Sequence, residues 1–250
     1  MDQWGIFVKK IVVYTALIGD YDNLHEPKKN FDNCVFVCFT DNRDLVSKIW
    51  KFIYIDTHDR QNGTLLNRHY KFFPHEYFAD YEYSIYIDSN IKILNDPCPL
   101  INKYLRRVNI ACPRHLERDC IYLEADTCVC YGIAERSEVE ILKSRYNREG
   151  FPQKFGLAEN NIICRRHNEQ EIISLMNKWW LELNHGPKRD QLSLMYLIWK
   201  NSIPFLLMDE NSKNKNQYFS YMLHKKDLNK NIIKKAITNE IEYNCIPSLK

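Results

Sequence analysis

The stretch that decides the fold is Glu82-Tyr-Ser-Ile-Tyr-Ile-Asp88-Ser-Asn90-Ile-Lys-Ile-Leu-Asn-Asp96-Pro97. Its apolar run over residues 83–87 contains β-branched and aromatic residues between polar ones, a pattern typical of a buried central strand. Asp88 and Asn90 follow where this strand should end. Because one residue separates them, their side chains point to the same side. Their oxygens can then bind a hard divalent cation together with phosphate oxygens. A simple turn is the alternative, since Asp, Ser and Asn all favour turns.

The composition predicts one large domain. The chain has 250 residues, of which 45% are hydrophobic, and only 7 glycines and 9 prolines, so a substantial core without an internal linker is expected. The net charge is +3, and lysines and arginines are spread along the chain among 32 acidic residues. A nucleic-acid-binding protein normally shows a concentrated basic stripe. We therefore expect no nucleic-acid partner.

The nine cysteines are expected to be mostly free thiols in the core. The amino terminus Met1-Asp-Gln-Trp-Gly lacks the basic start and the apolar segment of a signal peptide, which predicts a reducing, cytoplasmic location. A zinc site is the alternative for four of them, but their spacing lacks the usual Cys-x-x-Cys pairs; these are Cys112, Cys120, Cys128 and Cys130. No apolar run approaches the ~20 residues of a bilayer span, so any contact with the inner face of a membrane would be peripheral.

Three further strands are predicted before the central one, over residues 10–17, 34–40 and 50–55. Each is followed by a polar loop. Residues 67–81 then show helical spacing, which Pro74 interrupts. Strands separated by crossovers predict an α/β domain with a mainly parallel sheet, whose ligands bind at the carboxyl ends of the strands.

Polar side chains near these strand ends are candidates for ligand contacts. We expect Thr15 and Asp41 to contact a nucleotide, although Asp41 would also serve as a cap between strand and turn. Arg68 and Lys71 are the basic residues placed to neutralise a diphosphate. Their charge would complement the cation that Asp88 and its neighbour are predicted to hold.

The second half of the chain is predicted to contain a strand over residues 109–115 and helices over 135–148, 168–183 and 190–199. The charged segment 116–126 is expected to line a polar cleft, or else to be the solvated face of a helix. Asp190 stands in the first turn of a predicted helix. The helix dipole favours an acidic residue there, so a capping role explains Asp190 about as well as a catalytic role does.

The end of the chain is predicted to contain an Asn- and Lys-rich mobile loop over residues 211–217 and a final helix over 228–241. His224 lies between them, beside two lysines. It would complete a metal site and help to neutralise a leaving diphosphate. A structural or merely exposed histidine is the alternative.

Several motifs together resemble a glycosyltransferase family of bacteria and plants, which was long catalogued as a domain of unknown function and has mucilage-related plant members. The resemblance covers residues 10–200 in the same order. The motifs are Val13-Tyr-Thr-Ala-Leu-Ile-Gly-Asp-Tyr-Asp-Asn-Leu-His-Glu-Pro27, Val37-Cys-Phe-Thr-Asp-Asn42, Lys71-Phe-Phe-Pro-His75, Ser84-Ile-Tyr-Ile-Asp-Ser-Asn-Ile91, Trp179-Trp-Leu-Glu182 and Arg189-Asp-Gln-Leu-Ser193.

The resemblance implies a nucleotide-sugar transferase of the GT-A type, a single Rossmann-like α/β domain with an Asp-x-Asp metal motif. Here the motif is Asp88-Ser89-Asn90, in which Asn90 is a neutral oxygen ligand that would weaken binding of Mn²⁺ or Mg²⁺. His224 corresponds by role and position to a late metal-binding histidine of such enzymes. Asp190 and Gln191 look like an Asp-Gln pair near the donor sugar in retaining members.

The resulting hypothesis is a cytoplasmic glycosyltransferase that moves a sugar from a nucleotide-diphosphate donor to a saccharide or glycolipid acceptor, in surface polysaccharide synthesis. Residues 1–107 would bind the nucleotide sugar and metal, residues 108–210 the sugar and acceptor, and residues 211–250 would form the mobile loop and last helix. Asp190 and Glu159 are the candidates for contacting the sugar or activating the acceptor hydroxyl.

The acceptor side is predicted to be shaped by three polar residues, His115, Arg118 and Glu124. Two other classes of function would use similar residues. One is a metal-dependent nucleotide-sugar hydrolase or nucleotidyltransferase, and the other is a non-catalytic protein that binds nucleotides or sugars. Polar candidates spread over several segments favour adjacent donor and acceptor sites, and hence a transferase.

Overall fold

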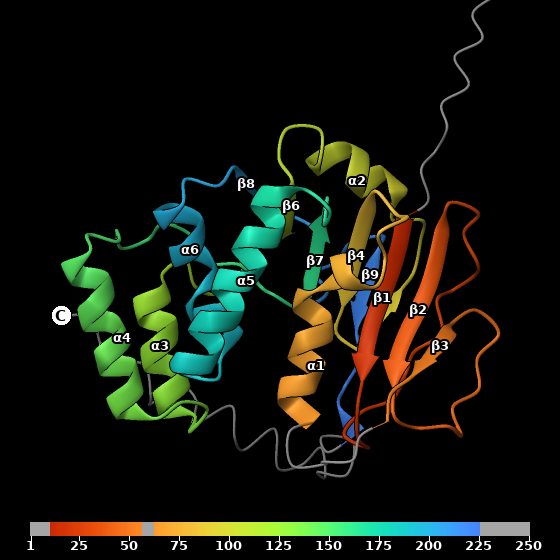
Figure 1. Cartoon of the computed structure of the whole chain (residues 1–250), viewed down its shortest axis with the longest axis horizontal. Coiled ribbons are helices and arrows are strands. Elements are labelled where there is room, and N and C mark those ends of the chain that lie inside the picture. Colours follow the sequence, from red (N-terminus) through yellow and green to blue (C-terminus); the bar gives the residue numbers. More distant parts are fainter. Residues whose placement is uncertain (1–10, 57–62, 226–250) are drawn as a thin grey trace, which may run out of the picture.

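The computed structural model describes residues 11–56 and 63–225 of the chain (Figure 1). Seven strands form its central sheet in the order β3-β2-β1-β4-β7-β6-β8. They are β1 (Ile11–Leu17), β2 (Cys34–Thr40), β3 (Lys51–Tyr54), β4 (Tyr83–Ile87), β6 (Ile110–Pro113), β7 (Ile162–Arg165) and β8 (Phe205–Met208). Only β7 runs antiparallel to its neighbours, β4 and β6. The predicted α/β domain with a mainly parallel sheet is confirmed.

Strand β1 lies inside the sheet and is buried along its whole length. Its alternate residues belong to two separate cores, with Val12 and Tyr14 on one face and Ile11 and Val13 on the other. A strand covered on both faces can be apolar throughout, which explains the unbroken apolar run in the sequence. In register, the ends of β1 and β2 lie side by side, with Leu17 opposite Thr40.

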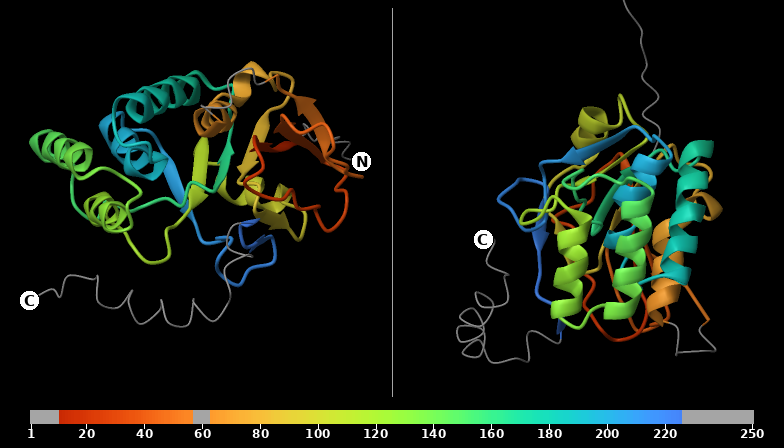
Figure 2. Two further views of the ribbon diagram at one scale, coloured as in Figure 1. Left: turned by 90° about the horizontal axis from the view of Figure 1, so that it is seen from below. Right: turned by 90° about the vertical axis from the view of Figure 1, so that its left-hand side faces the viewer.

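Six α-helices flank the sheet in the described part of the chain. Five of them, α1 and α3 to α6, pack on the face of the sheet that bears Val12 and Tyr14. Helix α2 packs on the opposite face, which bears Ile11 and Val13. Figures 1 and 2 place α3 and α4 at the end of the molecule opposite β3. The helices are α1 (Gly63–Phe72), α2 (Cys98–Tyr104), α3 (Ile121–Cys130), α4 (Arg136–Arg148), α5 (Gln170–His185) and α6 (Leu194–Lys200).

Two predicted helical segments differ from the structure in their ends. Pro74 starts the short 3₁₀-helix η2 (Pro74–Glu76) after α1 has ended, because a proline lacks the N–H that a continuing helix needs. The single helix predicted over residues 190–199 is wrong in detail. A 3₁₀-helix, η3 (Asp190–Leu192), comes first, and Ser193 separates it from α6 with φ −131° and ψ −25°.

A small second sheet pairs β5 (Ile91–Ile93) with β9 (Phe219–Tyr221) in antiparallel fashion. The pairing carries residues 222–225 back to the segment that follows β4, because the Met222 N–H bonds the Asn90 carbonyl at 2.8 Å. The preceding residues 211–217 form a loop, as predicted, and the Asn211 side chain is buried in it and donates to the Arg114 carbonyl at 2.9 Å. The helix predicted over residues 228–241 lies outside the described residues.

The described cysteines are all free thiols, and most are buried. Cys112, Cys120, Cys128 and Cys130, the alternative zinc ligands, form no metal-binding group within residues 11–56 and 63–225. Cys130 is exposed at the end of α3, while the other three are buried in the core. Over the same residues, none of the helices has the length and apolar character needed to cross a bilayer.

Candidate functional site

A pocket of about 470 Å³ opens beside the carboxyl ends of β1 and β4. In Figure 1 this is the lower edge of the sheet, where the arrows of β1 and β2 end. The pocket is lined by the loop after β1, the exposed side of α1, the residues after β4, and two residues distant in sequence. These lining residues are Ile18, Gly19, Asp20, Tyr21, Asp22, Gly63, Thr64, Asn67, Arg68, Asp88, Ser89, Asn90, Arg189 and His224.

The loop after β1 is fixed by polar side chains of two neighbouring elements. Asp41, directly after β2, accepts a hydrogen bond of 2.9 Å from the N–H of Gly19, which has a φ of +79°. On α1, Asn67 donates to the Ala16 carbonyl at 2.7 Å and to the Tyr21 hydroxyl at 3.0 Å. Asp41 therefore lies behind the wall of the pocket, as a support for the loop, while its predicted contact with a nucleotide stays a prediction.

The three residues predicted as metal ligands all line this pocket. Asp88 follows β4 and accepts a hydrogen bond of 2.9 Å from the Tyr86 hydroxyl. Asn90 is 3% exposed, and its Nδ2 lies 3.2 Å from the Met222 carbonyl and 3.2 Å from Nε2 of His224. Residues 134 positions apart in sequence thus meet because β9 pairs with β5.

His224 is oriented by Asp22, a residue to which the sequence assigned no role. Nδ1 of His224 lies 2.7 Å from Oδ2 of Asp22, which is buried. A carboxylate at this distance favours the tautomer with the proton on Nδ1, so the lone pair of Nε2 faces Asn90 and the pocket. A carboxylate, an amide and this nitrogen form a donor set that suits Mn²⁺ or Mg²⁺. The residue types therefore suit a divalent cation, but the Asn90 Nδ2 faces Nε2 of His224, so the amide must turn over before its oxygen and Nε2 can hold one ion together.

Lys71 and Asp190 form a buried ion pair next to the pocket. Their side chains are 2% and 3% exposed, and Lys71 Nζ lies 2.6 Å from Oδ2 of Asp190. Arg68 Nε lies 3.7 Å from the same oxygen, and Lys71 Nζ is 4.0 Å from Asp88. The pair links α1 to η3 across 119 positions of sequence.

The charges around Asp190 keep its carboxyl group ionised. Burial acts to raise its pKa, but the cations Arg68, Lys71 and Arg189 outweigh burial and hold the pKa of Asp190 well below its usual range. Burial also lowers the pKa of Lys71, against the opposing effect of Asp190. Because Lys71 is enclosed and paired, it positions Asp190, whereas Arg68 and Arg189 are the basic residues that line the pocket.

Arg165 is a further buried group that the sequence did not single out. It lies at the end of β7, is fully buried, and donates to the Tyr14 hydroxyl and, at 2.5 Å, to the Lys71 carbonyl. Tyr14 also donates to the Lys71 carbonyl, at 2.9 Å. Two buried side chains of the sheet, Tyr14 and Arg165, thus hold the backbone carbonyl of Lys71 in place.

A second polar cluster contains Glu159 and the predicted acceptor residues. Nε2 of His115 lies 3.8 Å from Glu124 and 3.9 Å from Glu159. Arg118 bonds Glu124 at 2.6 Å, and Lys213 bonds Glu159 at 2.9 Å. Burial lowers the pKa of His115, although both carboxylates act to raise it.

The two clusters adjoin through Arg189. This residue lines the pocket, and its Nη2 lies 3.9 Å from Oε1 of Glu124. The predicted donor and acceptor residues are thus neighbours in space.

Thr15 and Gln191 are placed differently from the other candidates. Thr15 is 0% exposed in the interior of β1, and its hydroxyl has no hydrogen-bond partner among the described residues. It does not line the pocket, so its predicted contact with a nucleotide has no support from its position. Gln191 is buried next to Asp190, and its Oε1 also lacks a partner among the described groups.

Fold and pocket together define an α/β domain with a pocket at the carboxyl ends of parallel strands, the place where domains of this class bind their ligands. The chain belongs to the TOD1/MUCI70 glycosyltransferase-like domain family, whose model matches residues 2–230. The resemblance noted in the sequence is thereby confirmed. The chain is also 24% identical over 211 residues to the "Probable hexosyltransferase MUCI70" of Arabidopsis thaliana. The match covers 73% of this chain and 36% of that protein, so the chain spans about a third of the relative's length.

Proposed function

We propose that the chain is a glycosyltransferase that moves a sugar from a nucleotide-diphosphate donor to a saccharide or glycolipid acceptor. Membership of a glycosyltransferase-like family supports the reaction class. The observation that carries the donor is the pocket itself, which is lined both by Asp88, Asn90 and His224 and by the basic residues Arg68 and Arg189. A diphosphate needs such a combination of cation ligands and basic side chains.

The metal would be held by the Asp88 carboxylate, the Asn90 amide oxygen and Nε2 of His224. A bound Mn²⁺ or Mg²⁺ would neutralise negative charge on the departing diphosphate. Asp22 keeps the imidazole in the tautomer that this role requires. Arg68 and Arg189, which also line the pocket, would bind phosphate oxygens of the donor.

Asp190 and Glu159 have different roles in this proposal. Asp190 is a positioning residue, because its carboxylate holds the side chain of Arg68 at the pocket wall while remaining paired with Lys71. Its low pKa makes it a poor proton acceptor. Glu159 is assigned to the acceptor hydroxyl, because its cluster reaches the pocket through Glu124 and Arg189.

The cellular setting is part of the same proposal. Free cysteines throughout the described part of the chain are expected in a reducing compartment, which supports a cytoplasmic location. A glycolipid acceptor would bring the protein to the inner face of a membrane as a peripheral component. Surface polysaccharide synthesis is the process in which such a reaction would serve.

Donor binding is tested by thermal shift of the full chain with UDP-, GDP- and dTDP-sugars, each with and without Mn²⁺, and with a CMP-sugar as the monophosphate control. A ligand at about 100 times its dissociation constant adds about 2.7 kcal/mol of stability, which corresponds to a rise in Tm of roughly 5 °C or more. We expect one diphosphate class to give this shift only with Mn²⁺. Asp88→Asn should abolish the shift, while Asp209→Asn, whose side chain is 81% exposed, should retain it.

Product analysis separates the transferase from its alternatives. With the donor that gives the shift, a transferase forms the glycosylated acceptor and releases nucleoside diphosphate in equal amounts. A hydrolase would release free sugar at the same rate whether or not acceptor is present. A nucleotidyltransferase would consume nucleoside triphosphate, and a binding protein would show the shift without turnover. Any of these three results would refute the proposal.

A further inference from the structure

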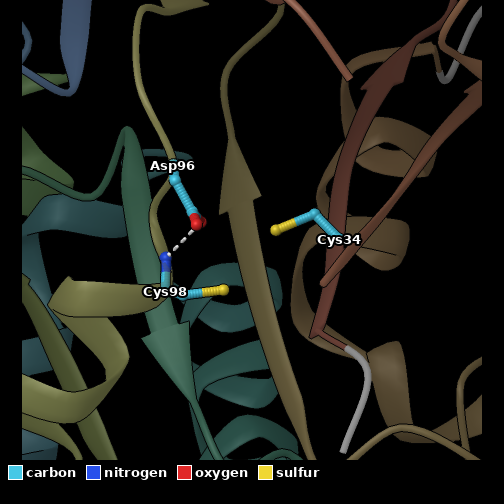
Figure 3. A group of neighbouring side chains, drawn as sticks. All are labelled: Cys34, Asp96 and Cys98. Carbon is cyan, nitrogen blue, oxygen red and sulfur yellow. Dashed lines mark hydrogen bonds between the residues drawn. The ribbon is translucent and has the colours of Figure 1, made fainter. Parts of the chain in front are cut away.

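A group of three potential metal ligands lies at the edge of the sheet opposite the pocket. Cys34, Asp96 and Cys98 each offer one ligand atom, and these atoms all lie within 4.8 Å of one another. Figure 3 shows the two sulfur atoms and the carboxylate directed toward a common space between β2 and the start of α2. Within the described chain, no other group of three or more His, Cys, Asp and Glu side chains brings its ligand atoms this close together.

Different elements hold the three side chains in place. Cys34 is the first residue of β2, and its N–H bonds the Phe31 carbonyl at 2.9 Å. Cys98 is the first residue of α2, and its N–H donates to Oδ1 of Asp96 at 2.9 Å. The approach of the two thiols therefore follows from backbone geometry and from the packing of α2 on the sheet.

This group is separate from the candidate active site. Cys34 pairs in register with Ile11 at the start of β1, whereas the pocket lies beyond Leu17 at the end of the same strand. Cys34 is buried, but Cys98 and Asp96 are partly exposed. An ion can therefore reach the group from solvent without passing through the pocket.

The chemistry of the group favours a soft or borderline metal. Two thiolates and a carboxylate suit Zn²⁺ and exclude Mg²⁺ as the preferred ion, because Mg²⁺ takes oxygen ligands in octahedral geometry. Binding of Zn²⁺ would form two sulfur–metal bonds and release two protons to solvent.

We propose that Cys34, Asp96 and Cys98 form a zinc site with three protein ligands and a water molecule in the fourth position. The ion would tie the start of β2 to the start of α2. This joins two elements that lie 64 positions apart in the sequence but meet at one edge of the sheet. The site is independent of the glycosyltransferase proposal, since no group in the pocket contributes sulfur.

The test uses the full chain, reduced and freed of metal, titrated with Co²⁺ in the presence of excess Mg²⁺. Cobalt bound by thiolates shows a charge-transfer absorption in the near ultraviolet, which oxygen and nitrogen ligands in the pocket cannot produce. We expect this band to saturate at one equivalent and to disappear when Zn²⁺ is added. Cys34→Ser and Cys98→Ser should remove the band, and Asp96→Asn should weaken Co²⁺ binding about tenfold or more.

Cys130→Ser is the matched control, because this thiol is exposed and lies outside the group. It should leave the titration unchanged. A second measurement uses the wild-type chain and follows alkylation of its thiols by peptide mass spectrometry. One equivalent of Zn²⁺ should slow alkylation of Cys34 and Cys98 at least tenfold. Alkylation of Cys130 should be unaffected. Absence of the cobalt band in the folded wild-type protein, or equal alkylation with and without zinc, would overturn the proposal.

Discussion

Asp190 carries a buried charge, with 2% of the residue exposed, and Oδ2 of its carboxylate lies 2.6 Å from Nζ of Lys71. Asp190→Asn keeps the shape of the side chain but leaves the Lys71 cation without its carboxylate. Removing one partner of a buried ion pair costs about 3–5 kcal/mol. We expect the free energy of unfolding, measured by urea denaturation at pH 7, to fall by about this amount.

Asp209→Asn is the control for that loss. Its carboxylate lies 3.8 Å from Lys103 but is 81% exposed, so a change below about 0.5 kcal/mol is expected. The effect of Asp190→Asn should also depend on pH. Because the pKa of Asp190 is lowered in the folded state, its stabilising contribution is complete above the unfolded value of about 4 and is lost as the pH falls below it. A pH-independent difference between wild type and variant would contradict this account.

His167 gives a second prediction at the residue scale. Its Nε2 lies 2.9 Å from the Phe78 carbonyl, and burial lowers its pKa from 6.5 to about 4. Between these values the unfolded chain binds a proton that the folded chain excludes, so stability falls as the pH drops from 6.5 toward 4. This group alone contributes about 2–3 kcal/mol to that fall, at about 1.4 kcal/mol for each pKa unit.

The measurement is the free energy of unfolding of wild type and His167→Gln at several pH values in this interval. The difference between the two proteins isolates this residue, since burial lowers the pKa of other histidines as well, His115 among them. The variant should show a shallower slope. His185→Gln, which changes an exposed histidine at the end of α5, should keep the wild-type slope; if both variants behave alike, the role given to His167 is wrong.

At the scale of elements, α1 determines the shape of the pocket. Asn67, Arg68 and Lys71 recur at helical spacing, so one helix anchors the loop after β1, supplies a basic group to the pocket and pairs with Asp190. The sequence predicted a helix here but not that Asn67 joins it to the Ala16 carbonyl. That contact depends on the crossing of α1 over β1, which no local pattern encodes.

Asn67→Ala tests this link between helix and loop. The change removes hydrogen bonds of 2.7 and 3.0 Å to the Ala16 carbonyl and the Tyr21 hydroxyl, and should cost about 1–2 kcal/mol. Hydrogen exchange of the amides of residues 18–22 should become faster by at least tenfold. Asn177→Ala removes only a bond within α5, to the Ile173 carbonyl, and should leave this loop unchanged.

At the scale of the whole molecule, the two halves of the chain share one sheet and both of its hydrophobic cores, and strand β4 of the first half pairs with strand β7 of the second. Strand β7 lies between β4 and β6. The core on the face of Val12 and Tyr14 contains residues as far along the chain as Ile198. A division of the chain at residue 107 separates the residues predicted to bind donor and acceptor. It does not separate two hydrophobic cores, because each core contains residues from both sides of the division. We therefore expect the protein to unfold in a single cooperative step.

Urea unfolding followed by tryptophan fluorescence and by circular dichroism tests this expectation. The two transitions should have the same midpoint and the same slope. A fragment of residues 1–107 should remain unfolded, because it lacks β7, the partner of β4, and the apolar residues of α3, α4, α5 and α6 that complete the core around Val12 and Tyr14. Two separate transitions for the full chain, or a folded fragment, would show that the halves are independent.

Local sequence determined the strands β1 to β4 and β6 and the helices α1, α4 and α5, because their apolar patterns reflect which faces are buried, whereas β5, β7, β8, β9 and α2 were not predicted. The strands predicted over residues 34–40 and 83–87 match β2 and β4 at both ends. It also predicted Asp88 and Asn90 as neighbouring polar groups after one strand, and both line the pocket. The motifs were sufficient to indicate the family that residues 2–230 match.

Tertiary structure alone decided which distant polar groups meet. The antiparallel placement of β7, the pairing of β9 with β5, and the meeting of Asp22 with His224 all join residues far apart in sequence. It also left Thr15 inside the sheet, and it brought Cys34 to Cys98 through the packing of α2. A sequence pattern records the burial of each residue, whereas these contacts depend on how whole elements cross and pair.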